Sequence, residues 1–188
     1  MEWILASASP RRKELFGKLV KTFEIIPATG EEQANGRTGA ALVEALATQK
    51  ALEVAALPMA SGKAVLGADT VVCLRGEVLG KPKDEADATR MLSALSGNTH
   101  QVFTGVCISY VKNGERQTLV ASDCTQVRFK VLTKAEIEAY VKTGSPMDKA
   151  GAYGIQDGGL VESISGSESN VIGLPIELCR RIMDGAGI

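Results

Sequence analysis

The chain has 188 residues, of which 45% are hydrophobic and 23% charged, and its net charge is −1. This length suits one domain with a substantial core, and the composition is ordinary for a globular protein. A net charge so close to zero provides no overall positive field for DNA, RNA or an anionic membrane. We therefore expect no nucleic-acid or membrane partner, and any anionic ligand must be held by a local cluster of cations.

The apolar segments and the cysteines both indicate a soluble, cytoplasmic protein. No apolar run reaches the length of about 18 residues that a membrane span needs. The N-terminal segment Met1–Ala6 is too short for a signal peptide and lacks a basic leader. The cysteines form no C-x-x-C pair, which predicts reduced and mostly buried thiols at Cys73, Cys107, Cys124 and Cys179.

The first half of the chain predicts alternating strands and helices. In chain order these are a strand at 3–6, a helix at 10–20, a strand at 22–28, a long helix at 38–57, strands at 64–68 and 70–74, and a turn at 75–77. The long helix is predicted from the helical spacing of Leu42, Val43, Leu46 and Val54.

The second half adds a β-rich insertion between helices. A helix is expected at 84–95, with Ala88, Met91, Leu92 and Leu95 facing inward. Strand segments at 99–111 and 116–132 are joined by Asn113-Gly114, a strong hairpin signal, and a capping box begins a helix at Thr133. A glycine-rich loop at 148–156, a strand at 160–165 and a helix at 175–183 follow. The whole predicts one α/β domain over residues 1–188 with a mixed sheet.

The segment Ser7-Ala8-Ser9-Pro10-Arg11-Arg12 combines a helix start with two adjacent arginines. Cations in a first helical turn oppose the helix dipole, at a cost of about a few tenths of a kcal/mol each. The arrangement becomes favourable if backbone N–H groups, serine hydroxyls and the two guanidinium groups bind an anion there. The alternative is that both arginines extend into solvent, and the segment alone favours neither.

Two charged residues interrupt apolar patterns. Lys50 falls on the same helical face as Val43 and Leu46, where an ammonium is costly unless it is paired or faces a pocket; the alternative is a stem that reaches water. Asp69 interrupts an apolar strand region, where an ionised oxygen on a rigid element suits metal binding or general-base catalysis. An aspartate that caps a turn between two strands is the alternative, and we favour the functional interpretation.

Three further segments are weaker evidence. Glu31-Glu32 lies in a polar loop, where paired acids are usually solvated, and Lys81 lies in a predicted turn. The small residues of the 148–156 loop let its backbone approach a ligand, and Gln156 offers a donor and an acceptor to a base edge. The alternative is a glycine-rich surface loop without a function.

Several other chemistries are disfavoured. Gly62-Lys63 lacks the upstream glycine and the following Ser or Thr of a Walker A motif. His100 is the only histidine, so neither a histidine-based zinc site nor a two-histidine phosphotransfer site can form. No G-x-S-x-G elbow is present for a serine nucleophile.

Taken together, these segments resemble the Maf family of nucleotide pyrophosphatases. The resemblance covers nearly the whole chain and rests on the order and spacing of short motifs. These are Ser7–Arg12, Glu31-Glu32, Lys50-Ala51, Gly67–Thr70, Gly80–Pro82, Ser96-Gly97, His100–Val102, Thr104–Val106, Asp148–Gln156 and Asn170–Pro175.

The resemblance implies a fold and a set of roles. The implied fold is a mixed α/β sheet flanked by helices, with two lobes and a central cleft. Asp69 would be the general base, and Glu32 and Asp69 would bind Mg²⁺ or Mn²⁺. Glu31 is the alternative to Glu32, because the preceding residues 28–30 depart from the Ser-x-x-Asp-Glu run of many members. The residues implied to bind the triphosphate are Ser7, Arg12, Lys50 and Lys81.

The resemblance also implies a substrate. Arg11, Thr70 and Gln156 are similar to the set of the branch that prefers dTTP and UTP. We therefore expect hydrolysis of pyrimidine nucleoside triphosphates, modified ones included, to the monophosphate and pyrophosphate in a nucleotide-pool house-cleaning role. The resemblance suggests a homodimer. Two alternatives stay open: a non-catalytic, nucleotide-sensing regulator of cell division that acts through a protein partner, and a purine pyrophosphatase acting on ITP or XTP.

Overall fold

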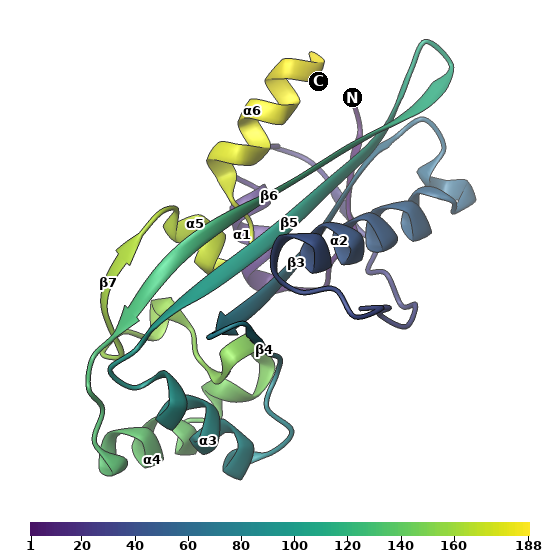
Figure 1. Ribbon diagram of the computed structural model, residues 1–188. Coiled ribbons are helices and arrows are strands. Elements are labelled where there is room, and N and C mark those ends of the chain that lie inside the picture. The colour runs from purple at the N-terminus through teal and green to yellow at the C-terminus, as the bar shows by residue number, and fades with distance from the viewer.

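The computed structural model describes residues 1–188 as a mixed sheet of seven strands with helices on both faces (Figure 1), which confirms the predicted fold class. The strands are β1 (Trp3–Leu5), β2 (Glu24–Ile25), β3 (Ala64–Leu74), β4 (Glu77–Leu79), β5 (Thr99–Lys112), β6 (Glu115–Phe129) and β7 (Val161–Ser165). The α-helices are α1 (Pro10–Phe16), α2 (Gly39–Ala55), α3 (Glu85–Leu95), α4 (Lys134–Lys142), α5 (Glu168–Ile172) and α6 (Ile176–Ala186).

The sheet runs in the order β2-β1-β3-β5-β6-β7, and β4 also pairs with β3. β1 is parallel to both of its neighbours, whereas all other pairs are antiparallel. The long β5–β6 hairpin turns at Asn113 and Gly114, whose φ angles are 53° and 82°. A two-residue hairpin turn of type I′ requires positive φ at both positions, so the predicted hairpin is confirmed with its turn chemistry.

One edge of β3 is shared by two short strands. β1 pairs with Ala64–Leu66 and β4 pairs with Val72–Leu74, which leaves residues 67–71 without a strand partner on this edge. The prediction of two strands around Asp69 is wrong: β3 is continuous, because β5 pairs with it along the other edge from Val65 to Cys73. The interruption near Asp69 lies in the partner strands.

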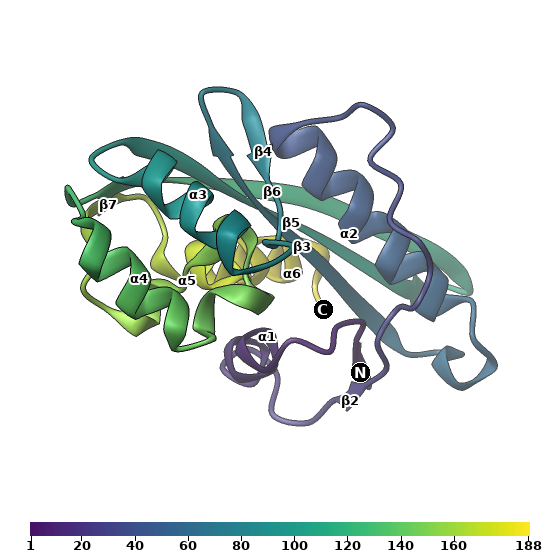
Figure 2. The same ribbon diagram turned by 90° about the horizontal axis from the view of Figure 1, so that it is seen from below.

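Helix α2 packs unusually close to one face of the sheet, whereas α1 and α6 lie on the other face (Figure 2). A Cβ atom at Gly67 would lie 2.5 Å from the carbonyl oxygen of Ala47, and one at Gly105 would lie 2.3 Å from that of Val43. The backbone of α2 therefore rests directly on β3 and β5. This close approach places Lys50, on α2, beside Asp69.

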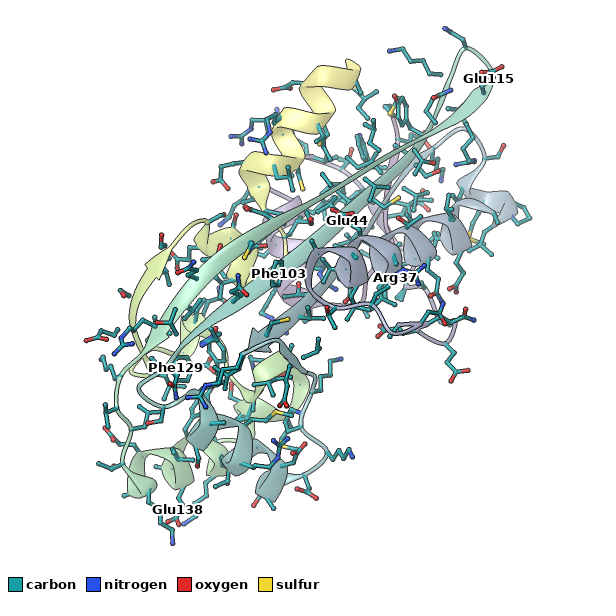
Figure 3. The ribbon with its side chains drawn as sticks, viewed as in Figure 1. Arg37, Glu44, Phe103, Glu115, Phe129 and Glu138 are labelled. Atoms are coloured by element: carbon teal, nitrogen blue, oxygen red, sulfur yellow. The ribbon has the colours of Figure 1, made fainter.

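The largest apolar core lies at the end of the molecule that carries α3 and α4. It contains the four predicted inward residues of α3 together with Val127, Phe129 and Tyr153. Figure 3 shows Phe129 at this end, near α3 and α4, and Glu115 at the far tip of the hairpin. The capping box of Thr133 and Glu136 is present at the start of α4, as predicted.

Several predicted boundaries are wrong for identifiable reasons. α1 ends at Phe16, and Lys18 and Leu19 continue it only through bonds between residues three apart, which are typical of a tightened last turn. β2 is two residues long because its only partner, β1, is itself short. The short strand β4 and the five-residue helix α5 were not predicted.

All four cysteines are free, and only Cys124 is exposed, which agrees with the expected reduced thiols. None of the helices is both long and apolar enough to cross a membrane.

Replacing Gly105 by alanine should destabilise the fold by about 1–3 kcal/mol, because the added methyl group would collide with the backbone of α2. Urea unfolding followed by circular dichroism measures this change. The matched control is Gly185→Ala in α6, where an added Cβ meets nothing within 4 Å. This control should be neutral or slightly stabilising, and equal losses in both variants would contradict the close packing of α2.

His100 should make stability depend on pH. It is 2% exposed, and burial lowers its pKa to about 4 from the ordinary 6.5. The unfolded chain therefore binds a proton before the folded chain does, and stability is lost as the pH falls from the ordinary value towards 4. Between pH 7 and pH 5.5 the free energy of unfolding should fall by about 1 kcal/mol from this group.

Urea unfolding at the two pH values measures the fall, with His100→Gln as the comparison because glutamine does not titrate. The variant should lose about 1 kcal/mol less between the two pH values than the wild type does. An identical fall in both proteins would show that His100 is not the responsible group.

Candidate active site

A pocket of about 780 Å³ opens at the unpaired edge of β3. Its walls come from the β1–α1 connection, α2, β3, the segment after β4 and the loop at 148–156. All of the residues that the sequence predicts for the site line this one pocket: Ser7, Arg11, Arg12, Glu32, Lys50, Asp69, Thr70, Lys81 and Gln156.

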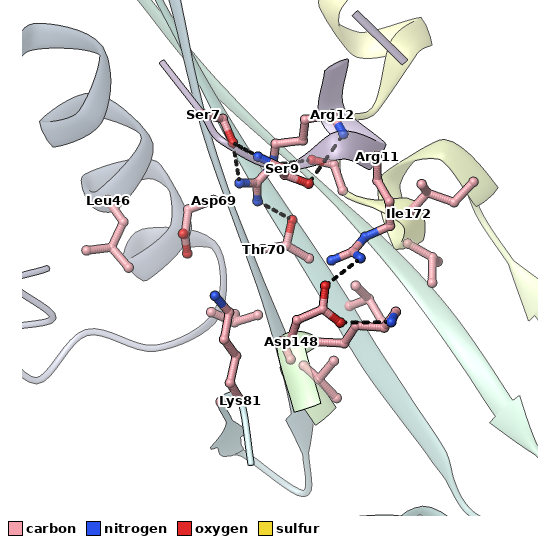
Figure 4. A pocket seen from close by; sticks show the side chains of 18 of the residues that line it. Ser7, Ser9, Arg11, Arg12, Leu46, Asp69, Thr70, Lys81, Asp148 and Ile172 are labelled. Carbon is pink, nitrogen blue, oxygen red and sulfur yellow. Dashed lines mark hydrogen bonds and ion pairs between the residues drawn. The ribbon is translucent and has the colours of Figure 1, made fainter. Parts of the chain in front are cut away.

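Asp69 and Thr70 reach the pocket from opposite faces of β3. Consecutive side chains of a strand alternate between faces, so Asp69 lies opposite Gly105 and under α2, whereas Thr70 lies opposite Thr104. In a strand that is paired along both edges, the neighbouring strands would separate two side chains on opposite faces. Here the edge between β1 and β4 is open, so one pocket contacts both side chains (Figure 4).

Lys50 holds two carboxylates together. Its Nζ lies 2.6 Å from Asp69 Oδ1 and 2.7 Å from Glu32 Oε1. The hydrogen bond from Lys50 holds the pKa of Glu32 below its ordinary value, although partial burial acts in the opposite direction. Lys50 therefore faces the pocket from the apolar side of α2, as one of its two interpretations predicted.

Glu31, the alternative to Glu32, does not line the pocket. Its carbonyl oxygen accepts a hydrogen bond of 2.7 Å from Gln49 Nε2, which ties this part of the loop to α2. The geometry thus brings Glu32, and not Glu31, beside Asp69. The role of Glu32 as a metal ligand stays a prediction.

The guanidinium group of Arg12 is fixed by three donated hydrogen bonds. Nε donates to the carbonyl of Gly173 at 2.9 Å, Nη2 to Thr70 Oγ1 at 3.0 Å and Nη1 to Ser7 Oγ at 3.3 Å. Burial lowers the pKa of Arg12, and the nearby Asp69 acts against this change. An arginine stays charged in proteins, so a positive charge of fixed orientation faces the pocket (Figure 4).

The start of α1 differs in one respect from the expectation. The side chain of Ser9 caps the helix by accepting from the backbone N–H of Arg12 at 3.4 Å. This amide is therefore engaged by the protein itself and is not free for an anion. The hydrogen-bond donors available to an anion here therefore come mainly from side chains and less from the backbone N–H groups at the start of α1.

A buried polar network, which the sequence did not single out for chemistry, supports Thr70. Thr70 Oγ1 and Thr104 Oγ1 are 2.9 Å apart, and Thr104 Oγ1 donates to the carbonyl of Asn170 at 2.8 Å. Asn170 in turn donates from Nδ2 to the carbonyl of Val102 and to Thr125 Oγ1. The available signal was that Thr104 and Asn170 both begin motifs of the family resemblance.

Arg11 takes a different course from Arg12. Its Nη1 donates to Asp148 Oδ2 at 3.2 Å and so joins α1 to the loop at 148–156 (Figure 4). Burial would raise the pKa of Asp148, but hydrogen bonds from Lys149 and Arg11 outweigh it and leave the pKa below its ordinary value. Asp148 is a pocket residue that the sequence did not predict.

The balance of charge in the pocket is positive, although the chain as a whole has a net charge of −1. Five cationic side chains line it against three carboxylates: Arg11, Arg12, Lys50, Lys81 and Lys149 against Glu32, Asp69 and Asp148. Lys81 and Gln156 are exposed and make no hydrogen bond to the protein through their side chains. Their polar ends are therefore available to a ligand.

The donor set suits a divalent cation that arrives with phosphate oxygens. Glu32 and Asp69 direct one oxygen each to the same point, and no group of three Asp, Glu, His or Cys side chains forms a cage. Mg²⁺ is commonly bound through one or two carboxylates together with substrate phosphates. The two carboxylates fit such a cation as partial ligands.

The mixed α/β fold, the excess of positive charge and the buried carboxylate form a site that suits a polyanion such as a chain of phosphates. The chain belongs to the Maf-like protein family, which it matches over residues 2–186. It is 45% identical to a dTTP/UTP pyrophosphatase of Thermococcus gammatolerans, over 96% of this chain and 95% of that protein. A second dTTP/UTP pyrophosphatase, from Symbiobacterium thermophilum, is 49% identical over 92% of this chain and 88% of its own.

Among solved structures, the Staphylococcus aureus Ham1 protein has the same fold. The TM-score is 0.53 at 18% identity, and the match covers 99% of this chain and all of that one. At this identity the likeness concerns the fold alone.

Replacing Thr104 by valine should destabilise the protein by about 1–3 kcal/mol, because the carbonyl of Asn170 loses its buried donor. The matched control is Thr118→Val, at an exposed position of β6, and it should change stability by less than about 0.5 kcal/mol. Thermal and urea unfolding measure both. Equal stability of the two variants would show that the hydrogen-bond network beneath Thr70 does not stabilise the protein.

Proposed function

We propose that this protein hydrolyses dTTP and UTP, and modified pyrimidine nucleoside triphosphates, to the monophosphate and pyrophosphate. The observation that carries the proposal is the contact of Lys50 with both Asp69 and Glu32. These three charged groups lie in one pocket that further cationic side chains line. The names of relatives at 45% and 49% identity support the same activity and substrates.

The triphosphate would bind to the cations of the pocket. Arg12 presents a guanidinium group that Thr70, Ser7 and Gly173 hold in place, so little side-chain entropy is lost when it binds phosphate oxygens. Lys81 is exposed and supplies a second, mobile charge. Charge-assisted hydrogen bonds of this kind are about twice as strong as neutral ones.

Asp69 would act as the general base. Lys50 fixes Oδ1, while Oδ2 makes no hydrogen bond to the protein and is free to accept a proton. Asp69 takes a proton from a water molecule as the water oxygen forms a bond to the α-phosphorus. The bond from that phosphorus to the oxygen bridging to the β-phosphorus breaks, and pyrophosphate leaves with the bonding electrons. Arg12 and Lys81 stabilise the charge that develops on the leaving group.

Glu32 and Asp69 would hold Mg²⁺ or Mn²⁺. The cation supplies positive charge that offsets the charge of the phosphates in the transition state. Lys50, whose ammonium contacts both carboxylates, would also bind the triphosphate.

The base would be recognised at the loop end of the pocket. Gln156 carries a free amide with a donor and an acceptor, and Thr70 and Arg11 line the same pocket. Residues 1–188 would act as one domain, in the cytoplasm and as a homodimer.

Asp69→Asn should abolish pyrophosphate release while the fold stays intact, because no other residue of the proposed mechanism acts as the general base. The experiment measures release from dTTP, UTP, ITP and GTP with Mg²⁺ or Mn²⁺, for wild type and variant. Release from dTTP and UTP that disappears in the variant supports the proposal. Preference for ITP would indicate a purine pyrophosphatase. Binding without release in the wild type would indicate a nucleotide sensor.

Lys81→Ala should lower kcat/KM for UTP by about 10- to 150-fold, since it removes a charge-assisted contact of about 1.5–3 kcal/mol. Arg12→Ala should lose at least as much, because it also leaves Thr70 and Gly173 without a donor. The matched control is Lys83→Ala, an exposed lysine two residues away that does not line the pocket. Equal kinetics of Lys81→Ala and Lys83→Ala would place the triphosphate elsewhere.

A further inference from the structure

One wall of the pocket is a loop without strand or α-helix. It consists of three short 3₁₀ turns, at Ser145–Asp148, Ala150–Ala152 and Ile155–Asp157. Ile155 and Gln156, at its tip, line the pocket. Short turns of this kind have few internal hydrogen bonds, so the position of the tip depends on side chains that hold the loop from behind.

Three side chains hold the loop from behind, and we call them the Tyr140 bracket: Tyr140, Ser145 and Asp157. The hydroxyl of Tyr140, on α4, donates to Asp157 Oδ2 at 2.6 Å and accepts from the backbone N–H of Gly154 at 3.0 Å. Ser145 Oγ donates to the same oxygen of Asp157 at 2.6 Å. The bracket therefore closes on both ends of the segment that carries Ile155 and Gln156.

Packing behind the tip is tight as well. A Cβ atom at Gly154 would lie 2.9 Å from Lys149 Cε and 3.1 Å from Asp157 Oδ2. Lys149 Nζ donates to the carbonyl oxygen and the hydroxyl of Ser145. Burial, and then the hydrogen bond to Asp157, raise the pKa of Tyr140, so its hydroxyl keeps the proton that it donates.

None of the three bracket residues lines the pocket. We infer that the Tyr140 bracket positions the Gly154–Asp157 segment for recognition of the nucleobase, and that Tyr140 and Asp157 are specificity-determining positioning residues. The inference rests on the proposed function, because it assigns the loop end of the pocket to the base of a nucleoside triphosphate.

The bracket holds the loop itself, and Lys149, which belongs to the loop, is the one pocket cation that forms a hydrogen bond with a bracket residue. Arg12, Lys50 and Lys81 come from α1, α2 and the segment after β4, and none of them contacts a bracket residue. Loss of the bracket should therefore change the choice of base and leave the handling of the triphosphate chain unchanged.

The test is Tyr140→Phe, which removes only the hydroxyl. We expect KM for UTP to rise about tenfold with little change in kcat, and the preference for UTP over GTP to fall by a similar factor. The inhibition constant of inorganic triphosphate, which has no base, should stay at its wild-type value. Calorimetric binding of UTP and GTP should show the same loss of preference.

Matched variants separate positioning from general damage. Tyr110→Phe removes the hydroxyl of another buried tyrosine, which makes no hydrogen bond and packs in a separate apolar core between the sheet and helices α1 and α6. It should leave all of these values unchanged. Asp157→Asn keeps an acceptor for Tyr140 and should retain more of the base preference than Asp157→Ala. If Tyr140→Phe fails to fold, these two variants of Asp157 decide the question.

The outcomes are distinct. An active wild type with an unchanged UTP-to-GTP ratio in Tyr140→Phe overturns the inference and leaves the proposed function standing. Weaker inhibition by inorganic triphosphate, in parallel with lower thermal stability and an unchanged ratio, also overturns it, because the bracket would then be merely structural. A wild type that binds UTP without releasing pyrophosphate overturns the proposed hydrolysis. The effect of Tyr140→Phe on the preference for binding UTP over GTP then tests the inference about the bracket by itself.

Discussion

The candidate site depends on the interruption along one edge of β3. A strand can present only one of two consecutive side chains to a given face, yet the pocket is lined by both Asp69 and Thr70. This is possible because the pairing of β3 with β1 ends at Leu66 of β3 and its pairing with β4 begins only at Val72 of β3. The backbone between them stays extended because β5 holds the other edge. A rigid element thus carries the carboxylate while the space beside it stays open, which suits a group that must keep its position and still reach a ligand.

The same geometry explains why the cost of burying charge is tolerable here. Asp69 is 8% exposed, and an unpaired buried carboxylate would be strongly disfavoured. The glycines at 67 and 105 let the backbone of α2 approach the sheet closely enough for the ammonium of Lys50 to reach both Asp69 and Glu32. The ammonium thus offsets part of the negative charge of the two carboxylates. Glu32 and Asp69 would also hold a divalent cation, which would supply further positive charge to a bound polyanion.

Local sequence patterns predicted the elements whose signals are local. The hairpin at Asn113 and Gly114, the inward face of α3 and the capping box of α4 each follow from a few adjacent residues, and each is confirmed. The segment around Asp69 was predicted as two strands, although β3 is continuous. Its continuity depends on pairing with β5, and the interruption lies between β1 and β4; the residues of β3 alone reveal neither. Residue chemistry and the family resemblance together named nine site residues, and all nine line one pocket. Thr104 and Asn170 were not singled out, because the role of a buried hydroxyl or amide depends on hydrogen-bond partners that the sequence does not show.

The two ends of the pocket are built on supports of different stiffness. Arg12, Lys50 and Asp69 are fixed by the sheet, by two helices and by direct hydrogen bonds between charged or buried groups. The other end is a loop of 3₁₀ turns, and its Gly154–Asp157 segment is held by the side chains of Tyr140 and Ser145. The triphosphate chain is common to all nucleotides, whereas the base distinguishes them. A rigid phosphate end and an adjustable base end would let one fold keep its reaction while changes behind the loop alter which nucleotide is accepted, without any change to the residues that carry out the hydrolysis.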